Sequence, residues 1–168
     1  MLKPSPLLRD LHGDSFASLS QRTQHDFAIA LAETSSIGIE KAQEKASQLY
    51  ARILPEGQYT SGHKFWDIVD PSNGKSIGQV WLKITPDGAS AFLYDLFIAP
   101  PFRHQGFGRV TMTAIESFAS ERGCSSIELH VFPENTAARR LYHGLGYNDT
   151  NSPNVLRKFF LPCPTLLP

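Results

Sequence analysis

A pair of glycines stands between an apolar run and an amphipathic run of this 168-residue sequence and limits the folds that the chain can adopt. Residues 91–98 are apolar except for Asp95, which predicts a central strand buried on both faces. Gly106 and Gly108 follow, and from residue 110 to 119 apolar side chains recur with helical spacing. The chain is therefore expected to run from a buried strand through a glycine loop into a helix.

A junction of this kind can bind an anion. The first turn of a helix has N–H groups without partners and the positive end of the helix dipole, so it can hold a diphosphate if small residues allow close approach. Gly106 and Gly108 carry no Cβ, and Arg103 and Arg109 add positive charge. Two glycines also commonly do no more than turn a strand into a helix, so the pair alone leaves both interpretations open. The dinucleotide-binding motif G-x-G-x-x-G fits less well, because Thr111 occupies the position of its third glycine. The sequence also has no G-K-[ST] motif of an ATPase-type phosphate-binding loop.

Hydrophobic periodicity predicts the other elements and a single domain over residues 1–168. Two amphipathic helices are expected within 14–54, with Asp14 or Ser15 capping the first and Pro55 ending the second. Strands follow within 63–99, two of them joined by a turn at 70–74. Beyond the glycines, the pattern predicts a strand at 127–132, a helix at about 135–145 and a terminal strand at 155–161. This order favours a mixed sheet covered by helices.

Composition excludes several classes of protein. Sixteen Lys and Arg residues balance sixteen Asp and Glu residues, so the charge does not favour a nucleic-acid partner. Cys124 and Cys163 lack the spacing of a zinc site or a redox pair, so no metal is expected. The first residues form no apolar signal segment, and no run approaches the roughly 20 apolar residues that span a bilayer. A cytoplasmic protein without a membrane partner is the expectation.

Two longer segments resemble one protein family. The segment 98–108, Ile-Ala-Pro-Pro-Phe-Arg-His-Gln-Gly-Phe-Gly, fits the signature R/Q-x-x-G-x-G/A after a strand that ends apolar-x-Pro. The segment 135–147 is similar to N-x-x-A-x-x-L-Y-x-x-x-G-F/Y. In this order, both resemble the GCN5-related N-acetyltransferase (GNAT) family. The resemblance implies an α/β fold with a mixed, mostly antiparallel central sheet, a strand-helix-strand cofactor unit within 103–147, and helices on both faces.

The resemblance also implies acetyl-CoA as cosubstrate and the transfer of its acetyl group to a primary amine by direct attack. The strand end would offer backbone groups to pantetheine, with an N–H near Phe97 aimed at the thioester carbonyl, and the loop and helix start would take the diphosphate. The cofactor-binding residues expected on this basis are Leu96, Phe97, Ile98, Arg103, His104, Gln105, Gly106, Phe107, Gly108, Arg109, Asn135 and Tyr142.

Four residues are candidates for catalytic roles, each with a structural alternative. By resemblance, Tyr142 protonates the leaving thiolate, although its helix face also suits a core tyrosine. Asp95 stands in an apolar strand, where desolvation would raise its pKa toward that of a useful base, or where it could form a buried ion pair. His130 is the second candidate for the base, or a packing residue, and His63 is a third candidate expected at the surface. Asn135 suits a helix N-cap as well as the cofactor site.

The acceptor stays open at this point. The resemblance places its pocket near residues 27–54 and 148–156, where Glu33, Glu40 and Glu44 could attract a cationic amine or simply face solvent. The acceptor could be a small molecule or an amine of a peptide or protein, and the use of longer acyl-CoAs is equally open. An alternative function is a non-catalytic acyl-CoA-binding or sensing module, which would have no need of Tyr142. A homodimer is plausible.

Overall fold

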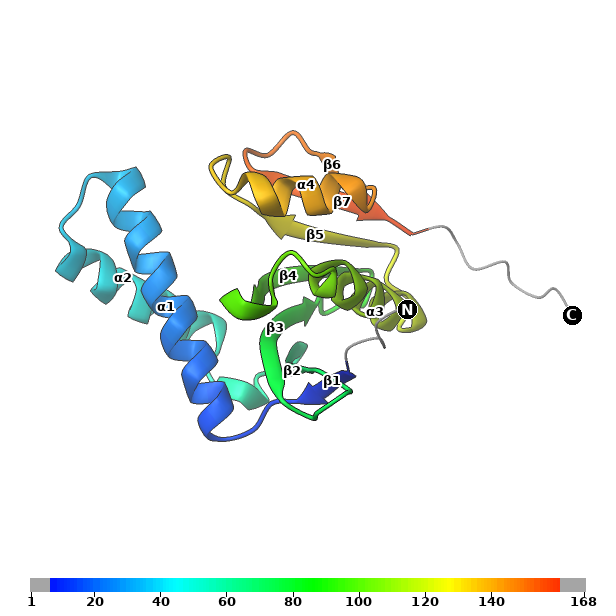
Figure 1. Cartoon of the computed structure of the whole chain (residues 1–168). Helices are drawn as coiled ribbons and strands as arrows, with labels where there is room; N and C mark the ends of the chain where they lie inside the picture. The colour runs from blue at the N-terminus through cyan, green and yellow to red at the C-terminus, as the bar shows by residue number, and fades with distance from the viewer. Residues whose placement is uncertain (1–6, 161–168) are drawn as a thin grey trace, which may run out of the picture.

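The computed structural model describes residues 7–160, and Leu161 and Cys163 lie outside this range. Its core is one seven-stranded sheet with the strand order β1-β2-β3-β4-β5-β7-β6 (Figure 1). The β4–β5 pair is parallel and the other pairs are antiparallel, which confirms the expected mixed, mostly antiparallel sheet. The strands are β1 (Leu7–Asp10), β2 (His63–Val69), β3 (Ser76–Ile84), β4 (Ser90–Ile98), β5 (Ser126–His130), β6 (Asn148–Asp149) and β7 (Val155–Phe159).

Helices cover both faces of the sheet, as expected. They are α1 (Asp14–Ser35), α2 (Ile39–Ile53), α3 (Phe107–Glu121) and α4 (Thr136–Gly144), with short 3-10 turns at Gly57–Tyr59 and Pro100–Phe102. The larger apolar core joins one face of the sheet to α3 and α4, and it includes fully buried Ile77, Leu82, Met112, Ile115 and Leu129. The smaller core lies under α1 and α2 around Leu19, Phe65 and Trp81. Figure 1 shows α1 and α2 beside β2 and β3, away from α4.

The central strand β4 departs from the sequence prediction in its second half. Ala91 and Leu93 are buried, but residues 94–98 are only half-buried, so the prediction of burial on both faces is wrong for this half. The parallel pairing with β5 ends at Leu93, opposite Leu129. At the same place the register with β3 shifts, since Trp81 pairs with Asp95 and Leu82 with Leu93, which makes Tyr94 the extra residue of a β-bulge. Beyond the bulge, no described strand pairs with β4 on the β5 side.

Some local details were not foreseen. The first helix begins at Asp14 but is preceded by Gly13, whose φ of 52° is in the left-handed region, so neither Asp14 nor Ser15 is the cap. The short edge strands β1 and β6 carry too few residues to give a periodic signal. The terminal strand ends at Phe159 rather than at Leu161, which is outside the described residues. Gly123, with φ of 87°, lies one residue beyond the C-cap of α3.

His63 is buried, so its expected place at the surface is wrong. It is 6% exposed, and its Nδ1 accepts a hydrogen bond of 2.8 Å from the indole N–H of Trp81. Aromatic rings surround it, with Phe65 stacked on one side and Tyr94 5.8 Å away. Burial, assisted by the charge of Lys83, lowers the pKa of His63 to about 4. His63 is thus a neutral member of the smaller core.

Candidate active site

A cleft of about 560 Å³ opens along the second half of β4 and the start of α3. With one exception, all the residues expected to bind the cofactor line it, from Leu96, Phe97 and Ile98 to Asn135 and Tyr142. The exception is Gln105, whose side-chain amide instead donates to the carbonyl of Pro101 at 2.9 Å. One cavity therefore extends from the second half of β4, which is no longer paired with β5, to the start of α3.

The two glycines of the loop have different structural roles. Gly106 is the N-cap of α3 with φ of 86°, and a Cβ built on it would meet no atom within 4 Å, so the space above this helix start is open. A Cβ on Gly108 would lie 3.2 Å from Cδ2 of Leu141, so this glycine lets α4 pack close to α3. His104 also has a left-handed φ of 58°, which turns the chain sharply before the helix. Gly106 therefore leaves room for a ligand at the positive end of α3.

Each of the two arginines of the loop donates a hydrogen bond to a backbone carbonyl beside the cleft. Arg103 donates from Nε to the carbonyl of Ile98 at 2.8 Å, and its guanidinium lies 5.7 Å from the ring centre of Phe97. Arg109 donates to the carbonyl of Gly144 at 3.2 Å, at the C-terminal end of α4. Both residues still line the cleft, so their charges remain next to the helix start.

Tyr142 and Asn135 come from α4 on the other side of the cleft. Tyr142 is 7% exposed, packs edge-to-face on Tyr147, and nevertheless lines the cavity. Burial raises the pKa of its phenol well above the usual value, so the phenol stays protonated. The side chain of Asn135 accepts a hydrogen bond from the backbone N–H of Ala138 at 3.2 Å, which makes it the N-cap of α4.

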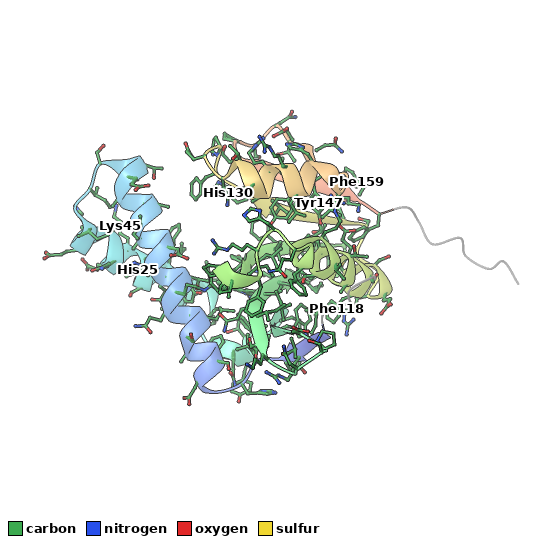
Figure 2. The ribbon with its side chains drawn as sticks, in the orientation of Figure 1. His25, Lys45, Phe118, His130, Tyr147 and Phe159 are labelled. Carbon is green, nitrogen blue, oxygen red and sulfur yellow. The ribbon has the colours of Figure 1, made fainter. Side chains whose placement is uncertain are left out.

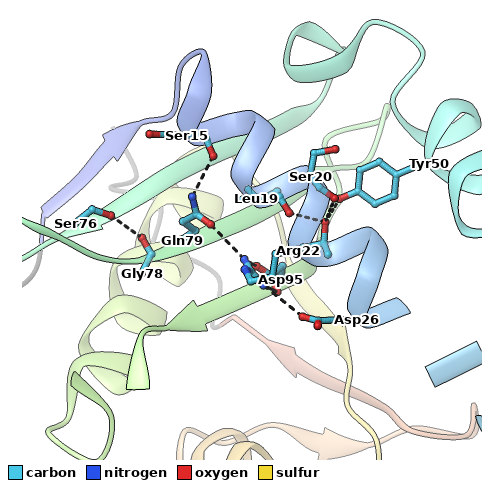
Figure 3. A network of polar contacts seen from close by, with 11 residues as sticks. Ser15, Leu19, Ser20, Arg22, Asp26, Tyr50, Ser76, Gly78, Gln79 and Asp95 are labelled. Carbon is cyan, nitrogen blue, oxygen red and sulfur yellow. Dashed lines mark hydrogen bonds and ion pairs between the residues drawn. The ribbon is translucent and has the colours of Figure 1, made fainter. Parts of the chain in front are cut away.

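Asp95 forms a two-point ion pair with Arg22, a residue of α1 that sequence analysis did not single out. Nη1 and Nη2 of Arg22 donate to the two carboxylate oxygens at 3.2 and 2.6 Å. Figure 3 shows Arg22 also reaching Gln79 of β3 and Asp26 one turn further along α1. The guanidinium lies 4.2 Å from the ring centre of Phe97. Burial raises the pKa of the Asp95 carboxyl, while its bonds to Arg22 oppose that effect.

A second cleft, of about 170 Å³, lies where β4 and β5 separate. Both clefts are lined by Asp95, Leu96, Asn135, Ala138 and Tyr142, whereas His130 lines only this one. Figure 2 labels His130, the last residue of β5. Partial burial lowers the pKa of the His130 imidazole, so the ring is neutral at pH 7. Neither cleft is lined by residues of 27–54 or 148–156, where an acceptor pocket was expected.

The described part of the chain contains neither a candidate metal site nor a candidate membrane-spanning helix. Within residues 7–160, no group of three or more His, Cys, Asp or Glu side chains could hold a metal ion. No helix in this range is long and apolar enough to cross a bilayer. Cys124 is a buried free thiol whose pKa is raised by desolvation.

A strand edge left open beside a glycine-capped helix start suits a cosubstrate with an extended arm and a diphosphate, as acyl-CoA-dependent acyltransferases use. Residues 26–147 match the family model described as "Acetyltransferase (GNAT) family". The chain belongs to this family and is an acetyl-CoA-dependent N-acetyltransferase.

A curated relative and a solved structure support this assignment, and a second solved structure shares the fold. The chain is 30% identical to the "Uncharacterized N-acetyltransferase YdgE" of Bacillus subtilis (strain 168) over 86% of its own length and 92% of that protein. The crystal structure of the putative acetyltransferase YycN from Bacillus subtilis is similar with a TM-score of 0.80 and 26% identity, over 88% of this chain and 95% of that one. The PaiA N-acetyltransferase of Thermoplasma acidophilum, solved in complex with coenzyme A, shares the fold with a TM-score of 0.65 and 17% identity, over 94% of this chain and 100% of that one.

Proposed function

We propose that this enzyme transfers the acetyl group of acetyl-CoA to a primary amine by direct attack, at the point where β4 and β5 separate. The observation that carries the proposal is the free edge of β4 beyond Tyr94, which runs into the N-terminus of α3 within a single cleft. A cosubstrate with an extended arm and a diphosphate fits these two features in succession. The acceptor is an amine-bearing small molecule or peptide.

In this proposal the backbone of 96–98 pairs with the pantetheine arm in the way that an added strand would. The N–H groups of the first turn of α3 receive the diphosphate, and the open space above Gly106 allows it to approach. Arg103 and Arg109 add positive charge beside this position. When bound, acetyl-CoA supplies the activated acetyl group, and the protein supplies position and proton transfer.

Tyr142 is the proposed proton donor. As the acetyl group passes from sulfur to nitrogen, the leaving sulfur needs a proton, and a phenol beside it can supply one. Burial keeps Tyr142 in its protonated form, and its position between the two clefts suits contact with the reacting atoms.

His130 is the proposed acceptor of the proton that the amine loses. It is neutral at pH 7 and shares the smaller cleft with Tyr142. Asp95 is the weaker candidate because both of its oxygens accept hydrogen bonds from Arg22, so protonation would break the ion pair. We therefore assign Asp95 a positioning role, as the anchor of Arg22 and of α1.

The Tyr142→Phe substitution tests the proton donor. It removes one hydroxyl from a packed ring, so we expect kcat to fall by about 100-fold while the affinity for acetyl-CoA, measured by calorimetry, is retained. Tyr59→Phe is the matched control, because Tyr59 is 77% exposed and lies outside both clefts. An unchanged kcat in Tyr142→Phe would refute the assignment. Binding of acetyl-CoA without turnover on any amine would instead support a sensing module.

The His130→Gln substitution tests the proton acceptor. A histidine base makes kcat/KM rise with pH up to the pKa of the ring, here below 6.5. We expect His130→Gln to lower kcat/KM and to remove this rise, whereas Asp95→Asn should keep it. The opposite pattern would assign the base to Asp95.

A further inference from the structure

The smaller cleft differs from the larger one in the chemistry of its walls. Apart from the residues that it shares with the larger cleft, its lining consists of Leu93, Tyr94, Leu129, His130, Val131 and Phe132. All of these are apolar or aromatic, and three carry rings. Its volume of about 170 Å³ is less than a third of the about 560 Å³ of the larger cleft, which suits one ring better than an extended chain.

The rings at the mouth of this cleft are arranged to accept another ring. Those of His130 and Phe132 meet edge-to-face at 4.8 Å with an interplanar angle of 81°. Phe132 is 38% exposed, so part of its surface is not used in packing against the protein. Tyr94 is held from behind by Trp81, stacked at 4.3 Å, and by Phe92 at 4.9 Å. Rings with fixed neighbours and free surface favour edge-to-face or offset contacts with an aromatic ligand.

The charges beside the cleft indicate how many ammonium groups an acceptor can bring. Asp95 is the one acidic side chain in the lining of the smaller cleft, and Arg22 neutralises it. Asp26, 62% exposed, is the further carboxylate at the larger cleft, 3.8 Å from the same Arg22. Around Arg22, two carboxylates thus share one guanidinium, which leaves a single negative charge at that point. Arg103 and Arg109, which also line the larger cleft, lie beside the helix start proposed to hold the diphosphate. One ammonium group can be attracted and then deprotonated, but a second would lose hydration without gaining a partner.

We propose that the smaller cleft is the acceptor subsite and that it selects a primary monoamine carrying an aromatic ring, an arylalkylamine. The ring contacts Tyr94 and Phe132, and the amine is directed toward His130 and Tyr142, which line the same cleft. This inference rests on the proposed function, since it places the acceptor on the β5 side of the strand that holds acetyl-CoA. Diamines and polyamines are disfavoured because no further carboxylate lines the subsite.

Three amines and two variants test the inference. The wild-type enzyme is assayed for release of free CoA thiol with 2-phenylethylamine, with ethylamine, which lacks the ring, and with 1,4-diaminobutane, which adds a second charge. We expect kcat/KM for 2-phenylethylamine to exceed both others at least tenfold. Phe132→Ala should lower kcat/KM for 2-phenylethylamine about tenfold, through KM, and leave the value for ethylamine within twofold. Phe159→Ala is the matched control, because Phe159 is 68% exposed on β7 and lines neither cleft.

The outcomes separate this inference from the proposed function. Equal or better use of 1,4-diaminobutane, or a ring preference that survives in Phe132→Ala, overturns the arylalkylamine assignment. So does a failure to acetylate any of the three amines when calorimetry shows that acetyl-CoA binds. Absence of acetyl-CoA binding in the folded wild-type protein would instead remove the proposed function itself.

Discussion

Removing Arg22 tests whether α1 is tied to the active-site strand through Asp95. In the wild type both carboxylate oxygens accept hydrogen bonds from Arg22, and the two side chains are 21% and 18% exposed. Loss of one partner from a fully buried pair costs about 3–5 kcal/mol, and the partial exposure here reduces this to about 2–3 kcal/mol. Arg22→Gln should therefore lower the free energy of unfolding by that amount, and should raise the pKa of Asp95 further.

A double-mutant cycle measures this coupling directly. Urea unfolding of the wild type, Arg22→Gln, Asp95→Asn and the double variant gives four free energies with a common m-value. We expect the double variant to be more stable than the sum of the single losses predicts, by at least about 1 kcal/mol, because it leaves no unpaired charge. If the single losses add to within about 0.5 kcal/mol, the ion pair does not hold α1 and the reasoning is wrong.

Two further substitutions test the packing of the sheet that carries the site. In Gly78→Ala the new Cβ would lie 2.1 Å from the carbonyl oxygen of Phe97, so we expect the free energy of unfolding in urea to fall by about 1–3 kcal/mol and the affinity for CoA to weaken. Gly38→Ala is the control, because a Cβ there meets nothing within 4 Å. Equal effects of the two substitutions would show that the close approach of Gly78 to Phe97 does not matter. The pKa of His63 is about 4 in the folded protein and 6.5 in the unfolded chain, so the unfolded chain takes up the proton first as the pH falls. The free energy of unfolding is therefore unaffected by His63 above pH 6.5 and falls by about 3 kcal/mol in total as the pH drops to 4. His63→Asn, which keeps an acceptor for Trp81, should show a smaller loss of stability between pH 7 and 4.5, and a pH dependence identical to that of the wild type would refute the burial argument.

The cofactor half of the site was accessible from sequence because its features are local. A strand, a glycine loop and a helix start follow one another within 91–109, and their periodicity and turn chemistry can be recognised without tertiary contacts. The cap at Asn135 is equally local, since its side chain accepts from an N–H three residues later. Such features depend on neighbours within a few residues, which the sequence displays.

The acceptor half of the site depends on contacts between segments that are far apart in the sequence. Sequence analysis did not predict these contacts for that reason. Arg22 meets Asp95 across 73 residues, and on an amphipathic helix an arginine four residues before an aspartate resembles an ordinary solvent-facing pair. A carboxylate in an apolar strand did signal a missing cation, but nothing in the sequence says which one. His63 was misplaced for a similar reason, because the indole that it accepts from belongs to the next strand.

A diphosphate site at the start of α3 is tested by calorimetric titration of the protein with coenzyme A and with pantetheine, which lacks the diphosphate. We expect Gly106→Val to weaken the affinity for coenzyme A at least tenfold and to leave the affinity for pantetheine unchanged, because only the diphosphate meets the new side chain. Gly123→Val is the matched control: it imposes the same left-handed strain at the opposite end of α3, with equally open space, and should leave both affinities unchanged. Wild-type affinity of Gly106→Val for coenzyme A would contradict a diphosphate site at the start of this helix.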